Sequence, residues 1–464
     1  MSALEIALVV LHTGVLLAQA CVFGTLAVQI VASRKVGNHL LAWLFPTLLV
    51  LMLAWLTLQT LVLTGDVTDI WLVLTSSVVG NMTALRWLVW LLAWALWRWT
   101  DPRLSILPAI TALVFYANVT HAAVSGDAWL RAAGLAHIFG AVAWVGSLPA
   151  LWLALDGPGA ARIAKRYTWF GLSCVAVIVV TAFVQAQTLA GGVVGLLGTD
   201  YGHAILVKIA LLLVLLALAL RHRFTLAPRL PESLGSLRRS VLTEAVIGLV
   251  VLSLASLLSS LPPGEHVQPN WPFSWRVSFD LMDDDELRRE VTNAARALGG
   301  AGLILLLAIL ARRIRWIAVA TALVIAWLAI PHFDLLFLPA EPTYFWQSTS
   351  GNTPGSIAAG KTAYAQNCAS CHGVGGAGDG PQAKGMRIPP ADLTAAHLWD
   401  HPDGELYWWI SHGMNGPDNR LVMPGFGEKL DDDTIWSIID FLHDNNPNKP
   451  EGGAAATGHM MMHH

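Results

Sequence analysis

Three residues near the carboxyl end of the chain have a spacing with specific chemistry: Cys368, Cys371 and the adjoining His372. Two thiols separated by two residues can bond to the two vinyl-derived carbons of one porphyrin, and the histidine that follows lies over the iron as an axial ligand. Two cysteines alone at this spacing would also suit zinc or thiol exchange, but the histidine favours haem. The motif predicts one covalently attached c-type haem and an iron centre that transfers electrons.

The segment 357–446 resembles class I cytochrome c. Beside the haem motif, the resemblance is carried by Gly360, Tyr364, Gly373, Gly-Asp-Gly-Pro at 378–381, Pro-Pro-Ala-Asp-Leu at 389–393, Met-Pro-Gly-Phe at 423–426 and a closing helix at 433–443. In that family the methionine of the Met-Pro-x-Phe stretch is the sixth iron ligand. The resemblance therefore implies Met423 for this role, with Met414 and His412 as competitors. A thioether opposite an imidazole raises the reduction potential, which suits an electron carrier.

A second group of candidate ligands consists of histidines inside or at the ends of apolar stretches: His12, His121, His137, His203 and His332. Ionisable residues in such stretches are costly and usually mark a function. Neutral imidazole suits copper, with Met52, Met82 and Cys21 as soft partners, and it equally suits the axial positions of a b-type haem. The spacing does not decide between copper, haem b and a structural role as a buried hydrogen-bond donor.

Two further sets of residues could contribute to binding. The amide and ammonium groups of one set either line the same polar pocket or cap helices: Lys208, Gln185, Gln187, Gln59 and Asn118. The other set is a tail of histidine and methionine at 459–464, whose imidazole and thioether groups suit copper. An unstructured chain end is the alternative interpretation of this tail.

The elements that must position these groups are apolar helices. Of the 464 residues, 55% are hydrophobic and only 13% are charged, which indicates a membrane protein. The net charge of −3 gives no electrostatic basis for binding nucleic acid. Cys21 and Cys174 have no local partner, so a disulfide framework is not expected. About ten stretches have spanning length: 4–32, 39–63, 83–99, 104–124, 129–155, 168–190, 203–220, 239–261, 295–311 and 315–338.

Only helices fit these stretches, because backbone groups in hydrocarbon need internal partners. We therefore predict an all-α fold, a polytopic helical bundle followed by a small all-α cytochrome domain. Basic residues gather in every second loop, beginning with Arg34 and Lys35 and ending with Arg312 to Arg315. By the positive-inside rule these loops face the cytoplasm and both termini lie on the other side, where c-type haem is attached. The five histidines then lie toward that outer side, and His39 and His222 toward the inner side.

The stretch 100–263 resembles the copper resistance protein D family. The matching residues are Thr-His-Ala at 120–122, His137 with Trp-Val-Gly at 144–146, 167–170, Gly-Thr-Asp-Tyr-Gly at 198–202, Lys208, and Glu244 through Leu-Pro-Pro at 261–263. The resemblance implies a helical protein that handles copper across the inner membrane. His203 departs from the family, which more often has another basic residue there, and members commonly lack a fused haem domain.

The expected organisation is a transmembrane domain at 1–338, a linker at 339–356, a cytochrome c domain at 357–446 and a flexible tail at 447–464. The leading hypothesis is a bacterial inner-membrane cytochrome that couples periplasmic electron transfer to copper handling, with lipid and a periplasmic electron-transfer protein as partners. The alternative is an enzyme, a membrane oxidoreductase that binds b-type haem in its helices and passes electrons from quinol, or another small reductant, to the c haem. A third hypothesis makes the helices an anchor only.

Overall fold

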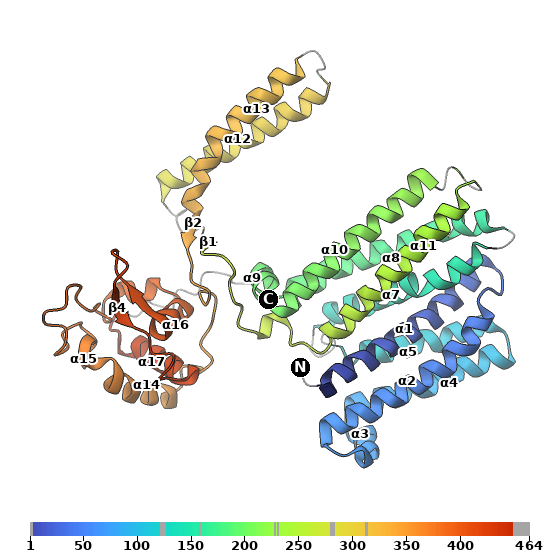
Figure 1. Cartoon of the computed structure of the whole chain (residues 1–464), viewed down its shortest axis with the longest axis horizontal. Coiled ribbons are helices and arrows are strands. Elements are labelled where there is room, and N and C mark those ends of the chain that lie inside the picture. Colours follow the sequence, from blue (N-terminus) through green and yellow to red (C-terminus); the bar gives the residue numbers. More distant parts are fainter. Residues whose placement is uncertain are drawn as a thin grey trace. The chain divides into compact units, whose positions relative to one another are not determined.

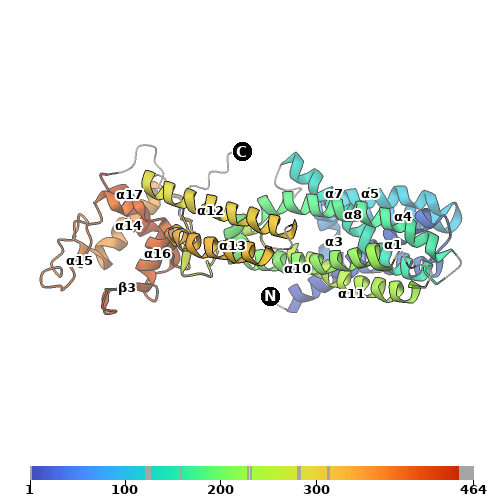
Figure 2. The same cartoon turned by 90° about the horizontal axis from the view of Figure 1, so that it is seen from above.

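The structure, a computed structural model, describes residues 3–120, 127–156, 159–226, 229, 232–278, 284–310 and 314–448. These residues are mostly helical, with two small two-stranded sheets. The chain forms two compact units, residues 1–267 and 268–464 (Figures 1 and 2). The boundary lies before the last two predicted spans, which group with the haem-binding segment and not with the bundle.

Nine of the described helices are long and apolar enough to cross a membrane. The stretch predicted at 104–124 contains a shorter apolar helix, Pro102–Ala117, next to residues outside the described part of the chain. Many large apolar side chains are exposed on these helices; Trp43 and Trp327 are 78% and 75% exposed. Such surfaces suit hydrocarbon, and the prediction of an all-α polytopic membrane protein is confirmed.

The first unit is a helical bundle. Its elements are α1 (Ala3–Ala32), α2 (Asn38–Thr64), η1 (Val67–Asp69), α3 (Ile70–Ser76), α4 (Val78–Trp99), η2 (Pro102–Ser105), α5 (Ile106–Ala117), α7 (Ala128–Ala154), α8 (Ala160–Leu189), α9 (Gly192–Gly198), α10 (Asp200–Arg221), the π-helical turn η3 (His222–Leu226), α11 (Leu234–Leu258) and η5 (Gly264–His266).

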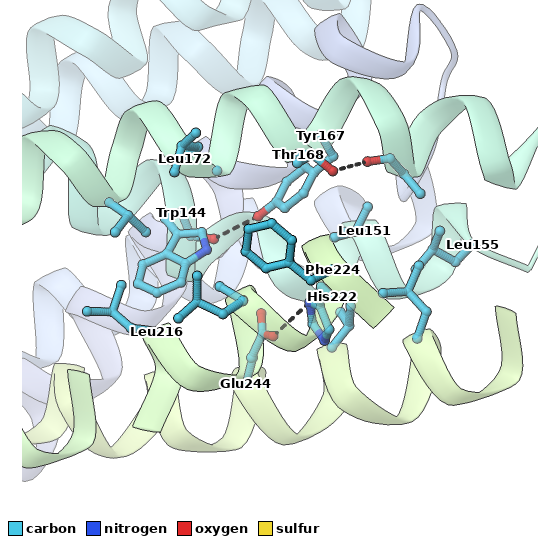
Figure 3. Close-up of a pocket in the computed structure, with 17 residues that line it drawn as sticks. Trp144, Leu151, Leu155, Tyr167, Thr168, Leu172, Leu216, His222, Phe224 and Glu244 are labelled. Atoms are coloured by element: carbon cyan, nitrogen blue, oxygen red, sulfur yellow. Dashed lines mark hydrogen bonds and ion pairs between the residues drawn. The ribbon is translucent and has the colours of Figure 1, made fainter. Parts of the chain in front are cut away.

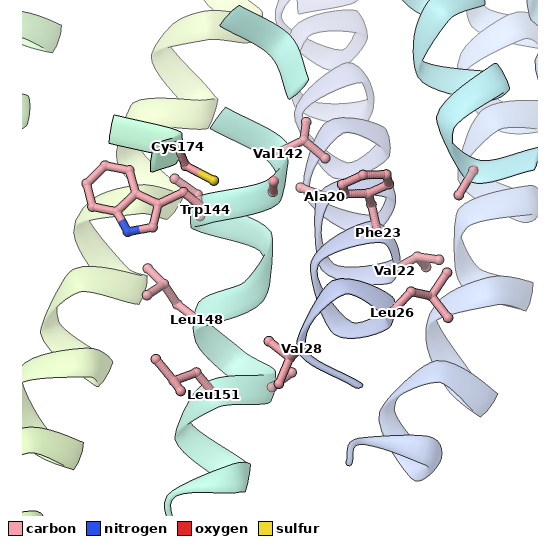
Figure 4. Packing of buried hydrophobic residues seen from close by; sticks show 14 of the residues in the cluster. Ala20, Val22, Phe23, Leu26, Val28, Val142, Trp144, Leu148, Leu151 and Cys174 are labelled. Atoms are coloured by element: carbon pink, nitrogen blue, oxygen red, sulfur yellow. The ribbon is translucent and has the colours of Figure 1, made fainter. Parts of the chain in front are cut away.

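Helices α1 and α7 form the centre of the bundle and meet through small residues (Figure 4). A Cβ atom added at Gly146 would lie 1.9 Å from the carbonyl oxygen of Ala20, and one added at Gly24 would lie 2.1 Å from the carbonyl carbon of Gly146. Small residues allow helix backbones in membranes to approach closely and gain van der Waals contact. The apolar side chains of Ala20, Val28 and Val142 lie between the two helices.

The second unit begins with a helical hairpin and continues into the haem-binding segment. Its elements are β1 (Trp275–Val277), α12 (Asp285–Leu310), α13 (Arg315–Ala329), η7 (Ile330–Leu336), β2 (Phe337–Pro339), α14 (Pro354–Asn367), α15 (Ala369–His372), η8 (Ala396–Asp400), α16 (Asp403–His412), β3 (Gly413–Asn415), β4 (Leu421–Pro424) and α17 (Asp432–Asn445). Strands β1 and β2 pair antiparallel, with Trp275 opposite Pro339.

Helices α14 and α17 cross closely in the haem-binding segment. A Cβ atom added at Gly360 would lie 1.8 Å from the carbonyl oxygen of Ser437, so only glycine fits the crossing. Next to it, the Tyr364 ring is 5.1 Å from that of Phe441, and its hydroxyl donates to the carbonyl oxygen of Gly373 at 2.9 Å. This contact joins the helix crossing to the residue after the haem motif.

Residues of the predicted linker make ordered contacts. The hydroxyl of Thr343, which is buried, donates to the carbonyl oxygen of Gly404 at 2.5 Å. The indole of Trp346 donates to the carbonyl oxygen of Pro269 at 3.1 Å and packs on the ring of Tyr407. These bonds connect the segment after β2 to α16 within the second unit. The histidine and methionine tail at 459–464 lies outside the described residues.

Candidate functional site

The three residues of the haem motif lie on one helical turn. Helix α15 places the amide of Cys371 3.1 Å, and the amide of His372 2.9 Å, from the carbonyl oxygen of Cys368. Positions three and four residues apart face the same side of a helix. Both thiols are unpaired cysteines, and burial raises the pKa of the Cys368 thiol to about 11, so this sulfur is protonated at neutral pH. The turn thus presents two thiols and one imidazole to the same side.

The orientation of the His372 ring fits an iron ligand. Its Nδ1 lies 3.0 Å from the carbonyl oxygen of Ala391, so this nitrogen carries the proton and donates the hydrogen bond. The same contact leaves Nε2 unprotonated and available to a metal. Ala391 belongs to the Pro-Pro-Ala-Asp-Leu stretch of the cytochrome resemblance, which gives that stretch a physical role in fixing the imidazole.

The two methionine candidates for the opposite side of the haem are direct neighbours. In the β3–β4 pair Met414 lies opposite Met423, so both side chains leave the same face of the sheet. Met423 and Cys368 both pack against the apolar core that includes Tyr364, whereas Met414 is not part of this core. The packing favours Met423. His412 is held elsewhere, because its ring stacks on Trp408 with 3.6 Å between centroids.

A buried carboxylate stabilises the start of the haem-binding segment. Asp440 on α17 is 3% exposed and accepts hydrogen bonds from the hydroxyls of Ser350 and Ser356, each at 2.5 Å. Buried charges need such partners, because their transfer out of water is costly. Ser356 also belongs to the capping box of α14 with Thr353, so the same serine fixes the beginning of the helix that leads to Cys368.

In the bundle, His12 lies in a polar cavity. Its Nδ1 is 3.2 Å from the hydroxyls of both Ser256 and Ser259 on α11. The cavity has a volume of about 450 Å³, and its wall also includes Glu5, Gln59, Arg86 and Tyr116. Gln59, predicted from the sequence to line a polar pocket, is therefore a neighbour of His12.

His137 lies in a different cavity of about 240 Å³. Its Nδ1 is 3.1 Å from the hydroxyl of Thr181 on α8. Lys208 and Gln185 line the same cavity, and Tyr116 lines both this cavity and the one of His12. His12 and His137 thus lie in adjacent but separate cavities, and the described residues that line each cavity include one imidazole.

The remaining predicted histidines do not join these two. The Nε2 of His203 lies 2.8 Å from the carbonyl oxygen of Leu197 on the surface. His332 belongs to the second unit, where its Nε2 is 3.6 Å from a carboxylate oxygen of Glu290. His121 lies outside the described residues. Among the described residues, no group of three or more His, Cys, Asp or Glu suited to a metal occurs, and the metal or haem b assignment of these histidines stays a prediction.

The soft ligands and the other amides are also placed apart from the histidines. Met52 is buried in the core of the bundle. Neither the His12 cavity nor the His137 cavity is lined by Met52, Met82 or Cys21. Gln187 does not line them either, and Asn118 donates to the carbonyl oxygen of Val114 within its own helical segment. Helix rotation, which a single apolar stretch does not reveal, decides these positions.

Two polar sites, one at Arg86 and one formed by His222 and Glu244, were given no binding role in the sequence analysis. Arg86 on α4 is 3% exposed, donates to Gln19 at 2.9 Å and lies over the ring of Tyr116 at 4.6 Å. Its signal was an arginine inside an apolar stretch. His222 on η3 lies 3.1 Å from Glu244 on α11, in a third cavity of about 310 Å³ (Figure 3). Here the signal was a carboxylate in the middle of an apolar stretch.

Trp144 connects the second and third cavities. This side chain on α7 is 4% exposed and lines both the His137 cavity and the Glu244 cavity. The indole therefore forms a wall between a cavity with Lys208 and one with a carboxylate.

Comparison with known proteins identifies two regions. Residues 161–258 match the family model of copper resistance protein D, and residues 355–442 match that of cytochrome c oxidase, cbb3-type, subunit III. The first match lies inside the stretch 100–263 that resembled the copper resistance protein D family. The chain thus carries a region like copper resistance protein D in its bundle and a cbb3-type cytochrome c region, which implies covalent haem c. No solved structure matches the chain.

Individual relatives cover the same two regions. Inner membrane protein YebZ of Escherichia coli (strain K12) is 27% identical over 175 residues, 35% of this chain and 60% of that protein. Copper transport protein CutJ of Bacillus subtilis (strain 168) is 28% identical over 186 residues, 38% of this chain and 32% of that protein. Cbb3-type cytochrome c oxidase subunit CcoP of Azospirillum brasilense is 36% identical over 85 residues, 18% of this chain and 26% of that protein. The chain spans between about a quarter and three fifths of these relatives.

Proposed function

We propose that the chain is a c-type cytochrome of the bacterial inner membrane that couples electron transfer outside the cytoplasm to copper handling in its helical bundle. The observation that carries this proposal is the presence, on one polypeptide, of a region like copper resistance protein D and a cytochrome c region. Copper binding and transfer depend on whether the ion is cuprous or cupric, so a haem on the same chain could set that state.

In the haem unit, we assign covalent attachment to Cys368 and Cys371 and axial ligation to His372 and Met423. The haem, when bound, supplies an iron that cycles between the ferric and ferrous states. The chain's own residues orient the ligands: the carbonyl oxygen of Ala391 holds the His372 ring, and the core contacts of Met423 hold the thioether. Two protein ligands leave the iron no open position, which suits electron transfer and not oxygen chemistry.

In the bundle, the proposal assigns copper to the cavities of His12 and His137. Each cavity places one imidazole beside polar groups that hydrocarbon would otherwise exclude. The Nδ1 atoms face the hydroxyls of Ser256, Ser259 and Thr181, so the Nε2 atoms are the ones available to a metal. The printed names of relatives, a copper transport protein among them, support this assignment.

The first test measures the haem type and metal content of the purified chain. We expect a pyridine haemochrome spectrum of c-type haem alone, in a ratio of one per chain, together with bound copper. Additional non-covalent haem b without copper would instead support the oxidoreductase hypothesis, in which the bundle histidines hold a second haem. C-type haem with neither copper nor haem b would contradict both assignments.

The second test replaces the histidines one at a time. We expect His137→Ala and His12→Ala each to weaken copper binding at least tenfold, as loss of a ligand does, while the haem spectrum stays unchanged. His39→Ala is the matched control, because His39 is exposed at the start of α2 and lines none of the three cavities. Copper binding that is unchanged in both cavity variants would overturn the copper assignment and leave the cytochrome assignment intact.

A further inference from the structure

The cavity that contains Glu244 and His222 has no place in the proposed copper and haem chemistry. Figure 3 shows the carboxylate and the imidazole facing each other, with the rings of Trp144, Tyr167 and Phe224 around them. Its volume of about 310 Å³ is at the lower end of the range for small-molecule sites.

The polar atoms of this cavity divide into satisfied and unsatisfied ones. The hydroxyl of Tyr167 is 2.6 Å from that of Ser147 and 3.4 Å from the carbonyl oxygen of Trp144, and Thr168 donates to the carbonyl oxygen of Ala164 at 2.9 Å. By contrast, Oε1 of Glu244 and Nε2 of His222 are buried and have no hydrogen-bond partner among the described residues. Nδ1 of His222 lies 3.1 Å from Oε1 of Glu244, which is within ion-pair distance, but the two atoms do not have hydrogen-bond geometry.

Two buried polar atoms without hydrogen-bond partners are expensive for the protein alone. Glu244 is 4% exposed, so water does not solvate its carboxylate freely. Nδ1 of His222 faces the carboxylate and carries the ring proton, so Nε2 is an acceptor. A ligand that offers two hydroxyl groups could satisfy both atoms, because the carboxylate and Nε2 each accept a hydrogen bond. The cavity therefore selects for a ligand with neighbouring polar groups of this kind.

The rim of the cavity is apolar and exposed. Leu172, Leu220 and Phe224 are 56%, 57% and 71% exposed, and they belong to spans whose outer surfaces suit hydrocarbon. The entrance thus faces acyl chains, and the ligand must be soluble in the membrane. A phosphate or a fatty-acid carboxylate would meet the Glu244 carboxylate and be repelled, which disfavours phospholipids and fatty acids. Only two side chains converge, too few to hold a metal ion.

We propose that this cavity binds the head group of a membrane quinol, with the ring hydroxyls donating hydrogen bonds to Glu244 and to Nε2 of His222. The aromatic walls contributed by Trp144, Tyr167 and Phe224 contact the ring, and the isoprenoid tail leaves between Leu172 and Leu220. This inference concerns binding and does not depend on copper binding in the other cavities.

The test is equilibrium binding of decylubiquinol, under anaerobic conditions with the haem reduced, to the full haem-containing chain in nanodiscs of synthetic phosphatidylcholine. Bound quinol is extracted and measured per haem after free quinol is removed. We expect saturable binding of one molecule per chain. We expect Glu244→Gln to weaken binding about tenfold or more, because a hydrogen bond to a charged group is lost. Leu216→Trp, which adds bulk to the cavity wall, should abolish binding.

Glu290→Gln is the matched control, because Glu290 also faces a histidine, His332, but lies outside the bundle. This variant should bind like the unaltered chain. Equal haem content and equal thermal transitions show that each variant is folded. The proposal is overturned if the unaltered chain shows no saturable binding, or if Leu216→Trp and Glu244→Gln both bind normally. A phospholipid that native mass spectrometry finds in place of the quinol would also overturn it.

Discussion

In the haem-binding segment the candidate ligands are neighbours in sequence, whereas the bundle takes its histidines from helices far apart in the chain. One turn of α15 sets the positions of Cys368, Cys371 and His372. In the bundle, His12 and His137 come from α1 and α7, and the rotation of each helix places them in separate cavities. Local backbone geometry therefore constrains the first site, and tertiary packing alone constrains the second.

Both units contain a glycine at a close crossing of two helices. Gly360 in the haem-binding segment and Gly146 in the bundle each bring two helix backbones into contact. The first crossing supports a site built on one turn, and the second sets the spacing of helices that carry separate cavities. Substitutions that disrupt one unit, with measurements on both, therefore test whether each site depends on its own unit.

The largest effect is expected from removal of the attachment thiols. The double variant Cys368→Ala, Cys371→Ala should lose all covalent haem, because no sulfur remains to form a thioether. Haem-dependent peroxidase staining of a denaturing gel measures this loss. Cys174→Ala, which removes a buried thiol of α8, is the control and should stain normally. Staining that persists in the double variant would contradict the haem assignment.

The next largest effect is expected at the glycine crossings. Gly360→Val should destabilise the haem-binding segment by about 3 kcal/mol or more, since a side chain would collide with backbone that cannot move aside. Thermal unfolding followed by haem absorbance measures this effect. Gly355→Ala in the same helix is the control, because its Cβ would lie 3.8 Å from the nearest atom. Gly146→Val should instead disrupt the bundle and leave the haem absorbance transition unchanged.

A smaller, spectroscopic effect separates the paired methionines. Met423→Leu should lower the reduction potential and remove the weak red absorbance band of methionine-ligated ferric haem, because the thioether stabilises ferrous iron. Met414→Leu changes the residue directly opposite in the sheet and should leave both properties intact. The reverse result would assign the ligand to Met414. Redox titration with optical detection distinguishes the two outcomes.

The smallest effect concerns pH. Burial raises the pKa of Asp403 above its usual range. His443, at 3.8 Å, lowers the pKa, and the charge of Asp440 raises it further. A raised pKa means that stability is lost as pH rises through the folded value. Asp403→Asn should therefore gain stability relative to the unaltered chain as the pH rises from about 4 toward neutral. Chemical unfolding of the haem-binding segment at several pH values measures this.

Asp392→Asn provides a control of opposite sign. The hydroxyl and amide of Thr394 hold the pKa of Asp392 below its usual range, so this carboxylate contributes stability that is present above the ordinary pKa. Its asparagine variant should lose stability relative to the unaltered chain over the same rise in pH. Two variants that changed in the same direction would show that local environment does not govern these groups.

The all-α fold could be predicted from the sequence because length and apolarity alone require helices in hydrocarbon. The positions of nine spans followed, and the stretch at 104–124 differed only because its described helix is short. The orientation of the termini remains a prediction. The expected domain bounds also remain a prediction, and the contacts of Thr343 and Trp346 could not be predicted because they join residues that are far apart in sequence.

How far each candidate site could be predicted depended on whether its residues are neighbours in the sequence. A contiguous motif carries its geometry with it, so the sequence indicated Cys368, Cys371 and His372 together. The Ala391 contact that fixes the imidazole needed tertiary structure. In the bundle, the sequence found individual histidines but not their separation, and it undervalued Glu244, whose partner His222 comes from another helix.

The backbone contact between α1 and α7 has a mechanical consequence. Ala20 and Gly146 meet without intervening side chains, so no rotamer change can widen or narrow the gap between these two helices. The two helices therefore hold His12, on α1, and His137, on α7, at a fixed distance from each other. Any change in the size of either cavity must then come from the other helices that line it, which include α11 for both cavities and α10 for the His137 cavity.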